Sequence, residues 1–140
     1  MWLPDYKFVV ELNADLISAT GGIVGVRDKS LLHSAVEGVN QTMFGEELYP
    51  TLVDKVAHIG YSIIKNHVFS DGNKRTGTMI MLITLEMNDE VLNDKLINQL
   101  EPFITRLAAG SKTLEDLKHV IREITKQHYN IRFRGQSTRS

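Results

Sequence analysis

The sequence predicts an all-α protein, a compact helical bundle with one small β-hairpin, on three observations. Apolar residues recur three or four positions apart along most of the 140 residues, which is the spacing of helices that bury one face. No long stretch alternates between apolar and polar residues, as the strands of a substantial sheet would. Residues that favour helix ends separate the periodic segments. The length suits a single domain, which we assign to residues 1–130, followed by a flexible basic tail at residues 131–140.

The composition is that of an ordinary globular protein, with 42% hydrophobic and 24% charged residues. The net charge of -1 provides no basic field for direct binding of nucleic acid. No apolar stretch is long enough to span a bilayer, and the first residues lack the profile of a secretory signal. The absence of cysteine excludes thiol catalysis and disulfides. We therefore expect a cytoplasmic protein without membrane contact.

The first half of the chain predicts two helices and an irregular segment. One helix is expected at residues 5–20 and should end at Gly21-Gly22, because glycine commonly terminates helices. A short helix follows at about residues 29–37. Residues 38–50 contain two glycines and a proline, so they are expected to form a small hairpin or flap.

Two strongly periodic helices should follow, joined by a short loop. In the first, from Thr51, four apolar residues and His67 share one face, so His67 should end that helix on its inward side. The four are Leu52, Val56, Ile59 and Ile63. Residues 68–72 then form a loop, and Asn73 is expected to be the N-cap of the next helix. That helix, at residues 74–87, is apolar nearly all round and belongs in the middle of the bundle.

The remaining residues predict further helices with recognisable ends. Asn88-Asp89-Glu90 should terminate the central helix, and Asn93 or Asp94 should cap the next one. An apolar stripe over residues 96–107 contains Pro102, which must kink or split the helix. The segment 113–116 matches a capping box and should open the last helix.

The loop between the two strongly periodic helices is the richest in chemistry. Its sequence is His67-Val68-Phe69-Ser70-Asp71-Gly72-Asn73-Lys74-Arg75. Gly72 lacks a side chain, so backbone N–H groups could approach an anion closely. These groups and the helix dipole favour a phosphate at the helix start near Asn73. Phe69 is expected to anchor the loop in the core.

The charged residues of this loop complete a site for phosphate chemistry. His67 is a candidate general base, and Asp71 offers the oxygen ligand that Mg²⁺ prefers beside phosphates. Lys74 and Arg75 would neutralise negative charge, although cations are unfavourable at a helix N-terminus and the fold does not require them there. Each residue alone also has an ordinary interpretation: a core histidine, a simple turn or a solvated helix start. Their combination between two helices favours the functional one.

These residues resemble the signature of the Fic/Doc superfamily, in its Doc (death-on-curing) toxin branch. Similarity continues through Gly21-Gly22-Ile23-Val24-Gly25-Val26-Arg27-Asp28, Leu31-Leu32-His33-Ser34-Ala35 and Glu47-Leu48-Tyr49-Pro50-Thr51-Leu52, covering roughly residues 5 to 128. The resemblance implies a Fic-type bundle, with His67, Lys74 and Arg75 catalytic, with Gly72, Asn73, Lys74 and Arg75 binding ATP, and with Asp71 holding Mg²⁺. It also implies that the flap aligns a target peptide by strand addition, a role that we assign to Phe44 and Tyr49.

Two departures from the AMP-transferring Fic pattern indicate the reaction. Lys74 stands where that pattern has a second glycine, and Thr78 stands where it has a final arginine. Both match the Doc branch. This resemblance implies a kinase that transfers the γ-phosphate of ATP to a hydroxyl of elongation factor Tu and arrests translation. His33 stands where an internal inhibitory helix would have Ser or Thr, so a cognate antitoxin should control the protein. An AMP transferase using the same His67 and an inactive partner-binding module remain the alternatives.

Overall fold

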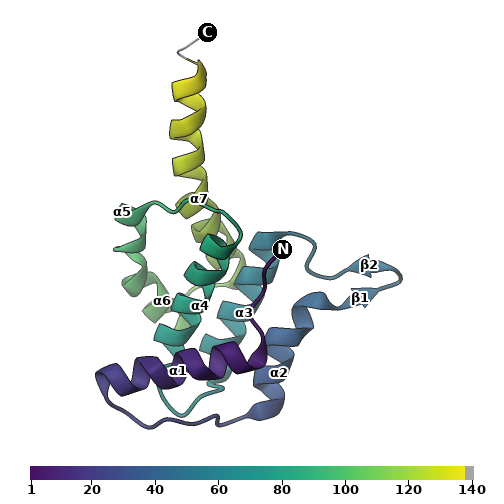
Figure 1. The fold of residues 1–140 in the computed structure, drawn as a ribbon, viewed down its shortest axis with the longest axis vertical. Helices are drawn as coiled ribbons and strands as arrows, with labels where there is room; N and C mark the ends of the chain where they lie inside the picture. Colours follow the sequence, from purple (N-terminus) through teal and green to yellow (C-terminus); the bar gives the residue numbers. More distant parts are fainter. Residues whose placement is uncertain (138–140) are drawn as a thin grey trace.

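The computed structural model describes the backbone of residues 1–137 and the side chains of residues 1–125. It is a helical bundle with one short 3-10 turn and one two-stranded antiparallel hairpin, which confirms the predicted fold class (Figure 1). No helix in the described part of the chain is both long and apolar enough to cross a membrane. In chain order the elements are α1 (Tyr6–Thr20), α2 (Lys29–Glu37), η1 (Gly38–Asn40), β1 (Thr42–Met43), β2 (Glu46–Glu47), α3 (Leu52–Asn66), α4 (Asn73–Met87), α5 (Asp94–Ile97), α6 (Leu100–Ala109) and α7 (Leu114–Ser137).

Helices α3 and α4 form the centre of the bundle. Helix α4 contacts α1, α3 and α6, and α3 also contacts α2, α6 and α7. Different faces of these two helices contribute to two buried clusters: one is shared with α6 and α7, the other with α1 and α2. The central position predicted for the apolar helix at residues 74–87 is therefore confirmed.

Two glycines allow α3 and α4 to pack closely. A Cβ atom on Gly77 would lie 2.7 Å from Cγ1 of Ile64 and 3.1 Å from the carbonyl oxygen of Gly60. A Cβ atom on Gly60 would likewise overlap the side chain of Met81. Larger residues would therefore overpack this contact. Because the loop at residues 67–72 joins these two helices, their close packing fixes both ends of the loop.

The helix ends follow the local signals in the sequence. Asp5 accepts a hydrogen bond of 2.8 Å from the backbone of α1, and Asn93 accepts one of 3.1 Å from the backbone of α5. Thr113 and Asp116 form the predicted capping box of α7, with bonds of 2.8 and 3.1 Å. The stripe at residues 96–107 is split before Pro102, which lies in the first turn of α6 and needs no N–H donor there.

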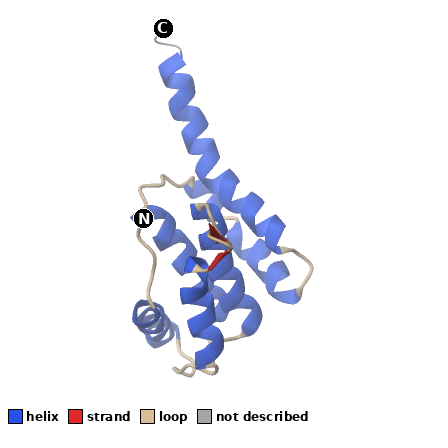
Figure 2. Ribbon diagram, turned by 90° about the vertical axis from the view of Figure 1, so that its right-hand side faces the viewer, coloured by secondary structure: helices blue, strands red, loops and turns tan. Residues whose placement is uncertain are grey.

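The last helix reaches into the segment that the sequence assigned to a tail. The backbone of α7 remains helical to Ser137, so it includes residues 131–137. Its last part extends beyond the bundle (Figures 1 and 2). Residues 138–140 of the predicted tail lie outside the described residues, and the flexibility of the segment stays a prediction.

The predicted hairpin is present but very short. Its turn residues Phe44 and Gly45 have φ angles of 53° and 81°, and positive φ at both central residues is what a two-residue type I′ hairpin turn requires. The buried Lys55 of α3 holds the hairpin by donating to the carbonyl oxygen of Val39 at 2.8 Å and to Glu47 Oε1 at 3.1 Å. The hairpin projects from the side of the bundle opposite to α5 and α6 (Figure 1).

Candidate functional site

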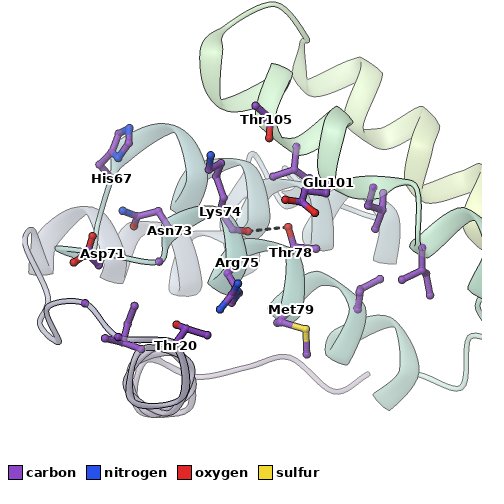
Figure 3. A pocket seen from close by; sticks show the side chains of 18 of the residues that line it. Thr20, His67, Asp71, Asn73, Lys74, Arg75, Thr78, Met79, Glu101 and Thr105 are labelled. Atoms are coloured by element: carbon purple, nitrogen blue, oxygen red, sulfur yellow. Dashed lines mark hydrogen bonds between the residues drawn. The ribbon is translucent and has the colours of Figure 1, made fainter.

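A cleft of about 890 Å³ opens between α1, α4 and α6. This volume lies in the range of small-molecule sites. The cleft brings together all the residues of the loop that were predicted to carry chemistry (Figure 3), namely His67, Asp71, Gly72, Asn73, Lys74 and Arg75. Its other end is lined mainly by apolar side chains of α4, α5 and α6, which are Met79, Leu82, Ile97, Leu100 and Ile104. The cleft can therefore hold a ligand with an anionic end and an apolar end.

His67 lines this cleft, but its side chain is exposed and does not lie on the inward face of a helix, where it was predicted. The helical periodicity places it on the inward face of α3, whereas the structure ends α3 at Asn66 and leaves His67 exposed. Its φ and ψ angles of 48° and 54° are left-handed, an uncommon conformation for a residue with a side chain. This reversal turns the imidazole out of the core. Its ring nitrogens have no hydrogen-bond partner among the described residues, so the ring is free to contact a ligand in the cleft.

The loop after His67 is fixed by a second segment of the chain. Phe69 is only 1% exposed, which confirms its role as the core anchor, and it forms an antiparallel bridge with Val26. Arg27 N–H donates to the carbonyl oxygen of Val68 at 2.8 Å, and Ser70 N–H donates to that of Gly25 at 3.0 Å. Residues 25–27 therefore act as a short strand beside the loop.

Asn73 holds the loop together from within and does not cap α4. Its Oδ1 accepts from the N–H of Phe69 at 2.9 Å, and its Nδ2 donates to the carbonyl oxygen of Phe69 at 3.0 Å. The N-cap of α4 is Gly72, so the predicted N-cap is wrong by one position. The buried backbone of Phe69 needs both a donor and an acceptor, and an amide side chain supplies both. Only the backbone N–H of Asn73 remains for a ligand.

Gly72 is required by the packing of the loop on α1. Its φ of 74° is left-handed, and a Cβ atom would lie 2.7 Å from Cδ1 of Ile17 and 3.3 Å from Nδ2 of Asn13. The missing side chain therefore makes room for α1, whereas the sequence suggested that it makes room for an anion. The role of Gly72 in ligand binding stays a prediction that rests on its backbone N–H.

Asp71 has one carboxylate oxygen occupied and one available. Oδ2 accepts from the N–H of Ile23 at 2.8 Å, and a Cβ atom on Gly22 would come within 3.1 Å of it. Oδ1 has no donor among the described residues. No group of three or more His, Cys, Asp or Glu residues that could hold a metal exists in that part of the chain. A single free carboxylate oxygen suits Mg²⁺ bound together with substrate phosphates.

The first turn of α4 supplies the positive charge. Lys74 and Arg75 are exposed and leave the helix on opposite sides, Lys74 towards α6 and Arg75 towards α1 (Figure 3). Backbone N–H groups in the first turn have no acceptor within a helix, which leaves those of Asn73, Lys74 and Arg75 for an anion. One turn later, the hydroxyl of Thr78 donates to the carbonyl oxygen of Lys74 at 2.8 Å.

Several residues of the site were not found from the sequence. Glu101 and Thr105 face Lys74 from α6 (Figure 3), and no sequence motif connects them with the loop. Asn13 was detectable in principle, since it interrupts the buried stripe formed with Val9 and Ile17 on α1. A polar residue in such a stripe indicates a specific hydrogen-bond partner.

The proposed flap residues are not brought to the cleft. Phe44 is fully exposed at the tip of the hairpin, and no residue of the hairpin lines the cleft. Tyr49 lies against His58 of α3, with ring centroids 4.3 Å apart. Burial lowers the pKa of His58, against an opposing hydrogen bond with the backbone of Ser34. The contact of Phe44 and Tyr49 with a target stays a prediction.

Comparison with known proteins identifies the family to which this cleft belongs. The model of the Fic/DOC family matches residues 3–85, more than half of the 140 residues. The chain belongs to the Fic/DOC family. It is also similar to Toxin Doc of Mycolicibacterium smegmatis (strain ATCC 700084 / mc(2)155), with 33% identity over 100 residues that cover 71% of this chain and 77% of that protein. The resemblance inferred from His67–Arg75 and its flanking segments is thus confirmed. In this Fic/DOC protein the family match includes α1, α3 and most of α4, which place the loop.

Proposed function

We propose that this Fic/DOC protein is a Doc-like toxin that phosphorylates a translation factor. It would transfer the γ-phosphate of ATP to a hydroxyl group of elongation factor Tu in the cytoplasm and so arrest translation. A separate cognate antitoxin would control it. The name of the relative in Mycolicibacterium smegmatis, Toxin Doc, supports the toxin class, and the geometry of the cleft supports phosphate transfer.

The distribution of charge around α4 is the observation that favours a kinase over an AMP transferase. Lys74 and Arg75 are together in the first turn, whereas Thr78, one turn later, has its hydroxyl bonded to the helix backbone. The free N–H groups of this turn thus have a positively charged side chain on either side. A terminal phosphate placed there would receive the electrostatic stabilisation that phosphoryl transfer requires. An AMP transferase would instead need the α-phosphate at that point.

The proposed reaction uses His67 as the general base. The imidazole accepts the proton of the target hydroxyl while the hydroxyl oxygen forms a bond to the γ-phosphorus. The bond between the γ-phosphorus and the bridging oxygen breaks, and ADP leaves with the bonding electrons. Lys74, Arg75 and the N–H groups of the first turn of α4 stabilise the charge that develops on the transferring group. The apolar end of the cleft accommodates the nucleoside.

Asp71 would hold Mg²⁺ through Oδ1, together with the phosphates of ATP. The ion would supply neutralisation of the polyphosphate charge. The bond from Ile23 N–H to Oδ2 keeps the carboxylate oriented whether or not the ion is present.

A labelling experiment decides which part of ATP moves. The purified protein is incubated with elongation factor Tu and ATP labelled at either the α or the γ position. We expect label from the γ position only, with a gain in mass of one phosphate. Label from the α position with a gain of AMP would replace our proposal by the AMP transferase. No transfer by a folded protein that binds ATP would favour the inactive partner-binding module.

The same assay tests the proposed antitoxin. The protein of a neighbouring small gene, added in equal amount, should suppress transfer of the γ label, and an unrelated protein of similar size should not.

The segment at residues 23–26 offers a better place for a target peptide than the hairpin does. Ile23 N–H and the carbonyl oxygen of Gly25 are bonded to Asp71 and Ser70. Since backbone groups alternate in direction along an extended strand, those of Val24 should face away from the loop. The side chains of Ile23 and Val24 are 68% and 54% exposed. We propose that the target pairs with this edge, beside His67.

Substitutions in residues 23–26 and in the hairpin distinguish these two candidate sites for the target peptide. Val24→Pro removes one N–H from the proposed edge and should raise the KM for the target protein by about 2- to 10-fold, the effect of one hydrogen bond. Phe44→Ser at the tip of the hairpin should leave this KM unchanged. Steady-state kinetics with varied target concentration measure both. A higher KM for Phe44→Ser with an unchanged KM for Val24→Pro would assign the flap role to the hairpin, as the sequence suggested.

A further inference from the structure

Asn13 is a buried polar residue in the middle of the core-facing side of α1. It is 2% exposed and lies one turn from Val9 and from Ile17, which are also buried. An amide in such a position is costly unless its polar atoms are hydrogen-bonded. Its partners therefore explain why it is there.

The two partners of Asn13 lie in the site loop and in the first turn of α4. Nδ2 donates to the carbonyl oxygen of Asp71 at 2.9 Å and to Oγ1 of Thr76 at 3.0 Å. These acceptors are 58 and 63 residues away in the sequence and lie on either side of Gly72. One amide group of α1 thus joins the carbonyl of Asp71 in the loop to the first turn of α4.

We infer that Asn13 is a positioning residue that sets the direction of the N–H groups at the start of α4. In a trans peptide the C=O and N–H groups point to opposite sides. Fixing the carbonyl of Asp71 towards α1 therefore directs the N–H of Gly72 away from α1. Thr76 also donates its N–H to the carbonyl oxygen of Gly72 at 2.8 Å, so holding Thr76 fixes the first turn as well. The inference rests on the proposed function, since it assigns these N–H groups to a phosphate.

The chemistry of this position requires an amide side chain. Both partners present oxygen atoms to Asn13, so two N–H donors on one nitrogen satisfy them together. Leucine has a similar size but no donor, and would leave the carbonyl oxygen of Asp71 without its bond. The space is also restricted, because a Cβ atom on Gly72 would lie 3.3 Å from Nδ2. The residue acts through the loop and does not line the cleft.

The test compares Asn13→Leu with Ile121→Val, a core substitution in α7 that touches neither the loop nor the cleft. Amide hydrogen exchange measures how well the backbone N–H groups of the loop and of the first turn of α4 are protected. Calorimetric titration with ATP and Mg²⁺ measures the Kd for ATP, and thermal unfolding measures Tm. Asn13→Leu should speed exchange of the Thr76 amide and raise the Kd for ATP, each by about tenfold or more. Ile121→Val should lower Tm and change neither quantity.

The outcomes separate this inference from the proposed function. Exchange rates and Kd values in Asn13→Leu equal to those in Ile121→Val would overturn the positioning role. A wild-type protein that binds no ATP would overturn the proposed function, and the exchange rates would still decide whether Asn13 holds the loop. If Asn13→Leu does not fold, Thr76→Val removes one acceptor while keeping the shape of the side chain. It should then speed exchange of amides 72–76 and raise the Kd severalfold, and unchanged values would count against the inference.

Discussion

The His67→Ala variant is expected to transfer phosphate about 100- to 10,000-fold more slowly than the wild-type protein, the usual contribution of a general base. His67 is exposed in the cleft and has no hydrogen-bond partner among the described residues. Its loss should therefore change the free energy of unfolding by no more than about 0.5 kcal/mol. Initial rates of transfer to elongation factor Tu and thermal unfolding measure the two effects.

Two further substitutions make this result specific. His67→Asn removes the base but retains a residue that tolerates the left-handed backbone of this position, so it should be as inactive as His67→Ala. His119→Ala removes an exposed histidine from α7 and should leave the rate unchanged. An active His67→Asn variant would exclude the general-base role. Unfolding of both His67 variants would favour the structural histidine considered in the sequence analysis.

The Arg75→Ala variant should lower the rate of transfer by about 100-fold or more, because it removes charge stabilisation in the transition state. The same substitution should leave the stability of the protein unchanged or raise it slightly. A cation in the first turn of a helix opposes the helix dipole by about 0.3–1 kcal/mol, and Arg75 has no ion pair among the described residues. The variant should therefore unfold at an equal or slightly higher temperature while losing activity.

Lys29→Ala is the matched control, since Lys29 is also an exposed cation in the first turn of a helix but does not line the cleft. It should show the same small change in stability with an unchanged rate. Arg75→Lys should recover only part of the activity, because lysine cannot bind a phosphate through two parallel bonds. Full activity in Arg75→Ala would mean that this arginine is a solvated surface residue, and the choice of a kinase would then depend on Lys74 alone.

Local signals in the sequence determined most of the fold. Asn93 and Thr113 cap helices as predicted, Asp5 caps α1, and the stripe that contains Pro102 is split. These features depend on bonds between residues three or four positions apart, which a sequence displays directly. The sequence also determined the order of the chemical groups from His67 to Arg75. Their order between two helices was enough to predict an anion site and its family.

The tertiary structure decided how those groups are held. Periodicity placed His67 in the core because it assumes that the helix continues, whereas the chain reverses there into a left-handed conformation. Asn73 was assigned to a cap, but the buried backbone of Phe69 takes both of its polar atoms. The reason for Gly72 is the nearness of Ile17, more than fifty residues away in the chain.

Contact between residues that are far apart in the chain also explains why the sequence did not reveal some residues of the site. Asn13 and Glu101 reach the site from α1 and α6, and each is well separated in the chain from the loop that it faces. Contacts of this kind arise when helices pack, through buried surface and hydrogen bonds that no local pattern encodes. The sequence therefore determined which chemistry is present, and only the packing of α1, α4 and α6 determined the direction in which each group points.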